Sequence, residues 1–460
     1  MRIHSNIIAK LLFPIILFYL SLGCNRESND SEMETEKEIR IHSNEDFINT
    51  VNQYLEGKVD SDSIRSLLND SIDYSFLNKW IIENRNDTIA KKEWILGRCY
   101  YFGKGIEKDL DQAFLYYNSS ANQGLPEAEN SLGWLYKDGK GVEKDLTKAV
   151  QWYTKAAEQN YAFAQFNLAN CYYFGEGVEK DLAKAVEWFT KAAEQGDPNA
   201  QNNLADCYYY GEGVEKDLAK AVKWFTKAAD QGNLYAQNNL AICYNNGEGV
   251  ETDLAKAVEW YTKAAKQGNS DAQNMLAICY NNGEGVQKDL SAAVEWYTKA
   301  AEQGNSITQH NLAWRYYNGE GVEKDFNKAY EWFSKAAEQN IESSKKQLAL
   351  MYLEGKGTSV DIEKGLSLLI ELADNGNVDS QYRLGLMYEM GSSVEQNDQK
   401  AFEWYQKAAN QRHNPAEYRL GIFYDQGVIG AKNKRIARLW LDRAVSDGSK
   451  EAKEYLEQMK

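Results

Sequence analysis

The stretch GVEKDLAKAVEWFTKAAEQG, from Gly177 to Gly196, decides the fold because the chain keeps repeating it. Near-copies begin 36 residues apart, and the same frame continues toward both ends of the chain. Ten starts at a constant period indicate an array of small, similar units. The starts are Gly105, Gly141, Gly177, Gly213, Gly249, Gly285, Gly321, Gly357, Ser393 and Ile429.

Each unit reads as a pair of helices. In this stretch, Asp181 is a good N-cap, and Leu182 begins an apolar series at the spacing of one helix face. Gly196 follows where helices commonly stop in the left-handed conformation. The residues from Asp197 to about Tyr209 predict the first helix of the next unit, and Gly211-Glu212-Gly213 predicts the turn before its second helix. One such pair cannot bury its own apolar faces, so stacked neighbours must cover them.

The repeated pattern is specific enough to resemble a known family, the Sel1-like repeat. It reads Ala-x-x-x-Leu-(Ala/Gly)-x-x-Tyr, then Gly-x-Gly-Val-x-x-Asp, then Lys-Ala-x-x-Trp-(Tyr/Phe)-x-Lys-Ala-Ala-x-Gln-Gly. The resemblance covers roughly Ile89 to Leu456. In one unit the matching residues are Ala200, Leu204, Ala205, Tyr208, Gly211, Gly213, Val214, Asp217, Lys220, Ala221, Trp224, Phe225, Lys227, Ala228, Ala229, Gln231 and Gly232.

The resemblance implies an all-α, tetratricopeptide-like solenoid. We expect a right-handed α-α superhelix of about ten 36-residue helix-turn-helix repeats. The family's concave surface is lined mainly by first helices and usually holds protein partners. A fold of this kind does not by itself specify a function.

Composition limits the possible partners. The chain has 460 residues, 43% of them hydrophobic and 12% aromatic, which is ample for a continuous core. Its net charge of −16 makes duplex DNA or an acidic membrane surface an unfavourable partner. We therefore expect no nucleic-acid binding.

Residues 1–23 are predicted to be a signal peptide. Arg2 and Lys10 give a basic start, and the apolar run from Leu11 to Leu22 is too short to span a bilayer. The end of the run resembles a bacterial lipobox, which implies a lipidated Cys24 and an exported, membrane-anchored cell-envelope lipoprotein. Ser21 departs from the commonest lipobox pattern, so an ordinary signal peptide cleaved near Gly23 is the alternative.

The rest of the chain divides by composition. Residues 24–43 are polar and mostly acidic, which predicts a disordered tether. Residues 44–87 lack the repeat signature but keep helical apolar spacing, which predicts a divergent N-terminal helical cap. Residues 88–449 form the expected repeat array, and residues 450–460 form the expected C-terminal capping helix.

The chain offers no convincing catalytic or metal-binding pattern. Five cysteines share one repeat position without the short spacing of zinc ligands, so we interpret them as core residues. Ser343 and Lys346 have the Ser-x-x-Lys spacing of penicillin-recognising hydrolases but lack the companion motifs. We expect no cofactor, no metal and no enzymatic activity. The cysteines are Cys99, Cys171, Cys207, Cys243 and Cys279.

Polar and aromatic residues that recur on the first helices are the candidate partner-binding surface. On the inner wall they would form a ladder able to bond the backbone of an extended peptide; alternatively, the ladder bonds turns between repeats and serves structure alone. Trp314, at a position shared with Trp134, is either a partner anchor or packing. The other candidates are Gln165, Gln201, Gln237, Gln273, Gln309, Asn167, Asn203, Asn239, Tyr173 and Tyr209.

Three functions remain open at this point. The favoured hypothesis is an exported, membrane-tethered scaffold that binds a protein or peptide on its concave face. The alternatives are a cell-envelope hydrolase that uses Ser343, and a glycan-binding envelope protein.

Overall fold

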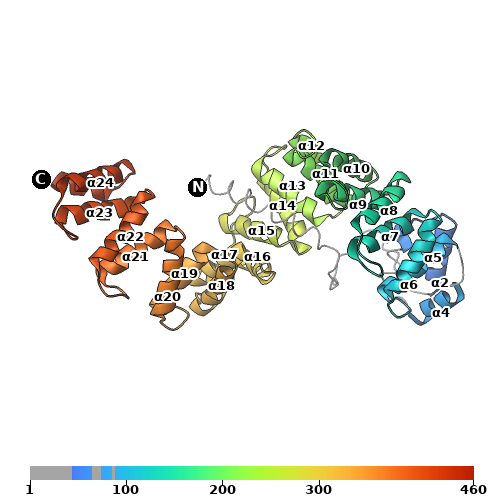
Figure 1. The fold of residues 1–460 in the computed structure, drawn as a ribbon, viewed down its shortest axis with the longest axis horizontal. Coiled ribbons are helices and arrows are strands. Elements are labelled where there is room, and N and C mark those ends of the chain that lie inside the picture. Colours follow the sequence, from blue (N-terminus) through green and yellow to red (C-terminus); the bar gives the residue numbers. More distant parts are fainter. Residues whose placement is uncertain (1–43, 65–73, 85–88, 460) are drawn as a thin grey trace. The chain divides into compact units, whose positions relative to one another are not determined.

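The computed structural model describes residues 44–64, 74–84 and 89–459 (Figure 1). All the regular elements in these ranges are helices, without a strand. The expected signal peptide, the lipidation site at Cys24 and the expected tether lie outside the described residues.

The chain forms two compact units. The first contains α2 (Asn44–Leu55), α4 (Tyr74–Asn84) and the C-terminal part of α5 (Ala90–Phe102). Its buried apolar residues are Val51, Tyr54, Ile64, Trp80, Ile81, Cys99 and Tyr101.

The second unit contains the N-terminal part of α5 and everything from Leu110 onward. Its other first helices are α7 (Pro126–Asp138), α9 (Ala162–Phe174), α11 (Pro198–Tyr210), α13 (Leu234–Asn246), α15 (Ser270–Asn282), α17 (Ser306–Asn318), α19 (Glu342–Glu354), α21 (Val378–Met390) and α23 (Asn414–Gln426). The second helices are α6 (Leu110–Asn122), α8 (Leu146–Glu158), α10 (Leu182–Glu194), α12 (Leu218–Asp230), α14 (Leu254–Lys266), α16 (Leu290–Glu302), α18 (Phe326–Glu338), α20 (Ile362–Asp374), α22 (Asp398–Asn410) and α24 (Lys434–Ser446).

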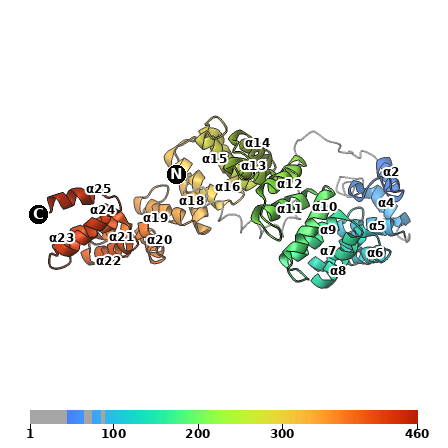
Figure 2. The same cartoon turned by 90° about the horizontal axis from the view of Figure 1, so that it is seen from above.

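From α6 to α25, each helix packs against the next one along the chain, and the helices of one pair share the larger contact (Figures 1 and 2). A structure built by repeating one local unit in this way is a solenoid. The expected all-α solenoid of 36-residue helix pairs is therefore confirmed.

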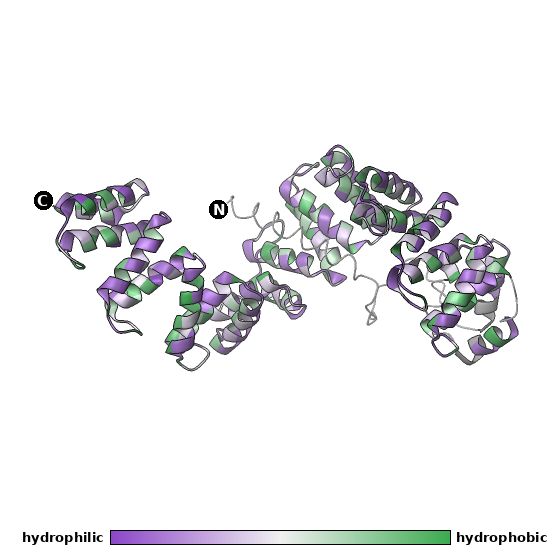
Figure 3. Ribbon diagram, in the orientation of Figure 1, coloured by the Kyte–Doolittle hydropathy of each residue, from purple (hydrophilic) through white to green (hydrophobic). Residues whose placement is uncertain are grey.

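Second helices are amphipathic because their apolar residues fall on one side. In α10, the Asp181 side chain caps the N-terminus by accepting from the backbone N–H of Lys184 at 3.0 Å. Ala185, Phe189 and Ala192 are buried on one face. Figure 3 shows hydrophobic and hydrophilic residues interspersed along the helices, as such faces require.

The turn inside each pair depends on two glycines. Gly211 ends α11 with φ of 77°, and its N–H donates to the Cys207 carbonyl at 2.9 Å. Gly213 has φ of 71°, and a Cβ there would lie 2.2 Å from the carbonyl oxygen of Leu182. The second glycine therefore lets the turn touch the second helix of the preceding pair.

Tryptophans on the second helices join neighbouring pairs. Trp224 of α12 packs against the buried clusters on both sides of its repeat. Lys227 lies one turn further on, with its Nζ 4.0 Å from the centre of the Trp224 ring. The apolar core therefore continues from one repeat to the next.

The array ends at α25 (Lys450–Gln458). Ala452 is buried, and Leu456 packs against the last apolar cluster. Lys450, Lys453 and Glu454 are exposed. The helix thus presents a charged side to solvent, as the end of a repeat array requires.

No helix within the three described ranges combines the length and apolar character needed to cross a bilayer.

Candidate functional site

The five glutamines of the candidate surface are buried, with 1% to 5% of their surface exposed. Gln201 shows how each of them is held. Its Nε2 donates to the Ala193 carbonyl at 3.0 Å, and its Oε1 accepts from Gln231 Nε2 at 2.8 Å. Gln165, Gln237, Gln273 and Gln309 make the corresponding two bonds.

These bonds correct the expectation that the glutamines face a partner. Gln201 of α11 bonds the end of α10 and the end of α12, so its amide joins consecutive repeats. A buried amide with both ends bonded has no free group to offer. The glutamines among the candidate residues therefore have the structural role, and the candidate surface does not include them.

The asparagines form a partly exposed row that crosses from repeat to repeat. Asn239 Nδ2 donates to Asn202 Oδ1 at 3.4 Å and to Asp206 Oδ1 at 3.3 Å. Asn203 bonds Asn170 at 3.4 Å in the same manner. Asn167 bonds Asn130 at 2.8 Å.

The two candidate tyrosines also bridge repeats. The Tyr173 hydroxyl donates to Glu212, and the Tyr209 hydroxyl donates to Glu248. In both cases the carboxylate belongs to the turn of the following repeat, 39 positions further on. The rings remain partly exposed beside the carboxylates.

Trp314 is partly exposed and held in place by aromatic neighbours. Its ring meets the edges of Tyr317 and Phe333 at centroid distances of 5.3 Å and 5.5 Å. Its Nε1 donates to His310 Nε2 at 3.1 Å. The residue therefore packs inside the array and also contributes to its surface.

The His310 side chain is bonded at both ring nitrogens. Because Nε2 accepts from Trp314, the proton of the neutral ring lies on Nδ1, which donates to Ser344 Oγ at 2.7 Å. Burial lowers the pKa of His310 to about 4, so the ring stays neutral near pH 7. This histidine donates to the serine and so has the wrong polarity for a general base toward it.

The residues of the hydrolase alternative are not brought together as a catalytic pair. Ser343 is exposed near the start of α19. Lys346 Nζ lies 2.8 Å from Asp379 Oδ2, and it holds the pKa of that carboxyl below its usual value. A lysine held in this ion pair is poorly placed to take a proton from Ser343.

All five cysteines of the repeats are unpaired and buried, which confirms the interpretation as core residues. Burial raises the pKa of Cys171 to about 11 and that of Cys243 to about 12. In the described part of the chain, no three His, Cys, Asp or Glu side chains are grouped so that they could hold a metal ion.

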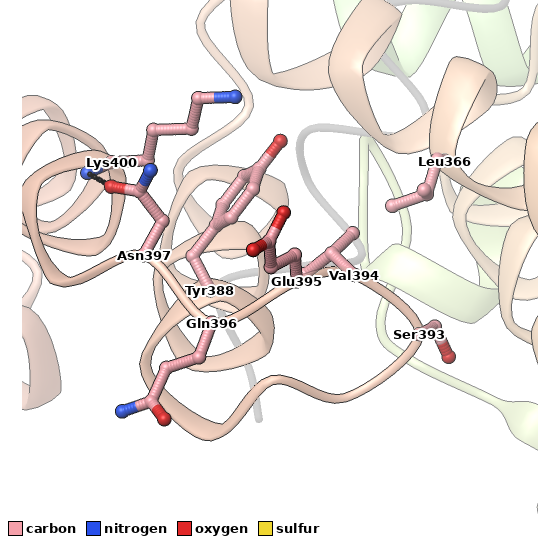
Figure 4. A pocket seen from close by; sticks show the side chains of 8 residues that line it. All are labelled: Leu366, Tyr388, Ser393, Val394, Glu395, Gln396, Asn397 and Lys400. Atoms are coloured by element: carbon pink, nitrogen blue, oxygen red, sulfur yellow. Dashed lines mark hydrogen bonds between the residues drawn. The ribbon is translucent and has the colours of Figure 1, made fainter.

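A hollow of about 440 Å³ lies at the turn before α22, where Ser393 replaces the second turn glycine (Figure 4). Asn397 caps α22 by accepting from the Lys400 backbone N–H at 2.9 Å. The lining is mostly polar, without buried polar groups that converge on one point. The lining residues are Leu366, Tyr388, Ser393, Val394, Glu395, Gln396, Asn397 and Lys400.

The first and second helices differ clearly in their content of charged residues. Three consecutive first helices, α9, α11 and α13, contain a single charged residue among them, Asp206. The second helices between them carry lysines and acids on their exposed faces. Phe174, Tyr210 and Tyr235 of these first helices are 43%, 40% and 39% exposed. Depletion of charge with enrichment of aromatic residues is typical of protein-binding surfaces.

Several residues of this region are absent from the sequence-based candidates: Phe174, Asp206, Tyr210 and Tyr235 on the first helices, and Glu212 and Glu248 in the turns that follow α11 and α13. A signal that could have found the glutamates is that Tyr173 and Glu212, like Tyr209 and Glu248, occupy the same two repeat positions 39 residues apart. Lys137 and Glu176 form an ion pair of 2.7 Å at the same spacing.

A family model of the Sel1 repeat matches the chain in ten consecutive segments, from residues 93–125 to residues 414–449. Among functionally curated proteins, none matches with significance.

Two solved structures illustrate the likeness. A protective antigen of uropathogenic Escherichia coli with an SLR fold is 31% identical, with a TM-score of 0.72 over 90% of each chain. A Sel1 repeat protein from Oxalobacter formigenes is 36% identical, with a TM-score of 0.49 over 53% of this chain and 96% of that one.

Proposed function

This chain belongs to the Sel1 repeat family, and from that premise we propose that it is an exported, membrane-tethered scaffold that binds a protein or peptide through its first helices. Sel1 repeat proteins are generally protein-interaction scaffolds. The binding would be non-enzymatic, and the concave face of the solenoid would hold the partner.

One observation carries this proposal. Between Ala162 and Asn246, the first helices expose tyrosine, phenylalanine and asparagine where the second helices expose lysine and glutamate. If solubility were the only requirement, charged residues would be expected on the exposed faces of both kinds of helix. Rigid aromatic rings beside adaptable amides are the chemistry that protein-binding surfaces use.

The members of the surface differ from the ladder expected from sequence. Tyr173, Tyr209, Asn203 and Asn239 belong to it, together with the exposed ring of Tyr210. The same Asn and Tyr side chains also bond between repeats, so they are held in fixed positions before a partner arrives. Such preorganisation reduces the entropy lost on binding.

The test is site-specific photo-crosslinking in the native cell. A photoreactive amino acid replaces Tyr210 on a first helix, and the matched control replaces Lys223 on the exposed face of the adjacent second helix. We expect one discrete protein adduct from position 210 and none from position 223. Equal adducts from the two positions, adducts to glycan alone, or none at all would overturn the proposal.

Export and tethering are a separate part of the proposal. They rest on the basic start, the short apolar run and Cys24, and the E. coli relative is described as a protective antigen. Metabolic labelling with an alkyne fatty acid should mark the wild-type chain and leave a Cys24→Ala variant unmarked. Equal labelling of both chains would exclude lipidation at this residue.

A further inference from the structure

Two exposed aromatic residues end consecutive first helices. Phe174 is the last residue of α9, and Tyr210 is the last residue of α11. Each meets the preceding tyrosine edge to face, with ring centroids 4.9 Å apart in both pairs. The two rings are thus held in place although 43% and 40% of their surfaces are exposed.

Three carboxylates accompany these rings. Glu212 accepts from Tyr173, the ring neighbour of Phe174, and Glu248 accepts from Tyr209, the ring neighbour of Tyr210. Asp206 lies one helical turn before Tyr210 on α11. We call Phe174, Asp206, Tyr209, Tyr210, Glu212 and Glu248 the acidic–aromatic surface.

No cation of the described chain pairs with these carboxylates. The polar contacts of Asp206 come from two amides, Asn202 Nδ2 at 3.1 Å and Asn239 Nδ2 at 3.3 Å. Within the described ranges, no Lys or Arg nitrogen lies within 4.0 Å of Asp206, Glu212 or Glu248. The nearest lysines to the rings are Lys180 and Lys216, whose Nζ atoms are 5.8 Å and 5.7 Å from the ring centres of Tyr173 and Tyr209.

The pKa values of Asp206 and the neighbouring tyrosines are raised. Burial, together with the charge of the nearby Glu212, raises the pKa of Asp206 to about 8. Burial raises the pKa values of Tyr173 and Tyr209, and the glutamate that each of them bonds raises them further, with a smaller effect of Asp206. Burial and then the charge of Asp206 raise the pKa of Tyr210. With a pKa of about 8, Asp206 holds its proton in most molecules near pH 7, so an arriving cation would pair with it by shifting this equilibrium toward the carboxylate.

The fold does not require this arrangement. In the two following repeats, the position of Asp206 is held by Ile242 and Ile278, and that of Tyr210 by Asn246 and Asn282. Those repeats form the same helix pairs with the same turn geometry. The acidic–aromatic surface is therefore a local addition to the common repeat.

We propose that the acidic–aromatic surface binds an arginine side chain of an extended segment of the protein partner. A guanidinium group stacks on aromatic rings and also donates two parallel hydrogen bonds to a carboxylate. A lysine ammonium is more strongly hydrated and lacks the planar pair of parallel N–H donors. This inference rests on the proposed function and adds the chemistry of the partner.

The test uses the full chain with 4-trifluoromethylphenylalanine in place of Phe174, followed by fluorine NMR. Three titrants are compared: N-acetyl-arginine methylamide and its citrulline and lysine analogues. Citrulline has nearly the same shape as arginine but is neutral. We expect a saturable shift with arginine, a weaker one with lysine and none with citrulline. Small-molecule titrants suit this measurement because single exposed contacts give weak binding.

Variants assign the effect to the carboxylates. Asp206→Asn restores the residue found at Asn170, and Glu212→Gln removes the adjacent charge without changing shape. We expect the two changes together to weaken arginine binding about fivefold or more. The matched control is Glu284→Gln, which removes a glutamate from the equivalent turn of a later repeat. In that repeat, Ile278 and Asn282 stand where Asp206 and Tyr210 do here. The control should leave the affinity for arginine unchanged.

The titration and the crosslinking together distinguish a failure of the arginine site from a failure of the proposed scaffold function. Equal shifts with arginine and citrulline, no saturable shift at all, or an unchanged affinity in the double variant would overturn the arginine site. If crosslinking from position 210 still yields a protein adduct in that case, the scaffold function stands without this site. If no protein adduct forms, the proposed function fails independently of the titration.

Discussion

Gln231 Nε2 lies 2.8 Å from Gln201 Oε1, although the two residues are 30 positions apart in the sequence. The same contact recurs along the array, and each inner glutamine also bonds a backbone carbonyl eight residues before it. From α9 to α18, these residues therefore form a series of buried and partly buried bonds that joins one helix pair to the next.

Removing one member of this set should destabilise the array. In Gln201→Leu, the Ala193 carbonyl keeps the Gly196 N–H and the Gln231 amide keeps the Lys227 carbonyl, but each loses its bond to Gln201. A hydrogen bond contributes about 0.5–1.5 kcal/mol, so the loss of both should cost about 1–3 kcal/mol. We expect a lower urea midpoint by circular dichroism. As a control, Gln287→Ala at an exposed position should change the stability by about 0.5 kcal/mol or less. Equal midpoints for Gln201→Leu and the wild type would contradict a structural role.

The second turn glycine should be far less tolerant than the glycine that follows the second helix. Gly213→Ala places a Cβ 2.2 Å from the Leu182 carbonyl oxygen at a positive φ, and we expect a loss of about 2–4 kcal/mol. Gly232→Asn meets no atom within 4 Å and reproduces Asn160 and Asn340, which adopt φ of 63°. Its cost should be about 1 kcal/mol or less.

Thermal unfolding of these two variants gives the comparison directly. A melting temperature of Gly213→Ala at or above that of Gly232→Asn would show that the contact between the turn and the preceding second helix is not needed.

The Asp206 carboxyl should make stability depend on pH. Its pKa is about 8 in the folded chain and near 3.8 when unfolded, so the folded state binds the proton more tightly. Stability from this group is therefore present below about pH 4 and is lost as the pH rises toward 8. Asp206→Asn should match the wild type near pH 4 and exceed it by about 1–2 kcal/mol at pH 8.5, a value reduced because the side chain is partly exposed.

Urea unfolding of both chains at pH 4.5, 6.5 and 8.5 measures this difference. Asp230→Asn, at an exposed position on α12, controls for the general effect of removing one negative charge. The prediction fails if the advantage of Asp206→Asn is constant across the three pH values or decreases as the pH rises.

The buried thiols should resist alkylation in the folded protein. Cys243 is 1% exposed, and burial raises its pKa to about 12, so little thiolate forms at pH 8. We expect iodoacetamide to leave Cys243 unmodified over a time in which a cysteine introduced by Asn246→Cys, at an exposed position of the same helix, reacts fully. Peptide mass spectrometry reads both sites, and equal rates would show that α13 opens readily.

Sequence reasoning predicted the elements of the fold because the signals are local. The 36-residue period, the cap at Asp181 and the apolar spacing from Leu182 can each be read within one unit, and the structure forms the helices where they indicate. The cysteines were predicted as core residues for the same reason, since their position alternates with other apolar side chains.

Periodicity could not predict which polar residues meet a partner. Gln201 and Asn203 are two residues apart on one helix, yet one amide is buried in bonds to neighbouring helices and the other lies in a partly exposed row. Both belong to the same regular pattern in the sequence. Their environments differ because the direction from a helix toward its neighbours is set only when the pairs stack.

The sequence by itself thus determined the helices, their turns and the repeated, charge-poor composition of the first helices. Only the tertiary structure decided that Asp206, Tyr210 and Glu248 share one surface, where no Lys or Arg nitrogen of the described residues lies within 4.0 Å of either carboxylate. Tyr209 and Glu248 are 39 positions apart and meet because consecutive pairs stack with their turns side by side. Such contacts depend on the three-dimensional offset between repeats, which no single repeat contains.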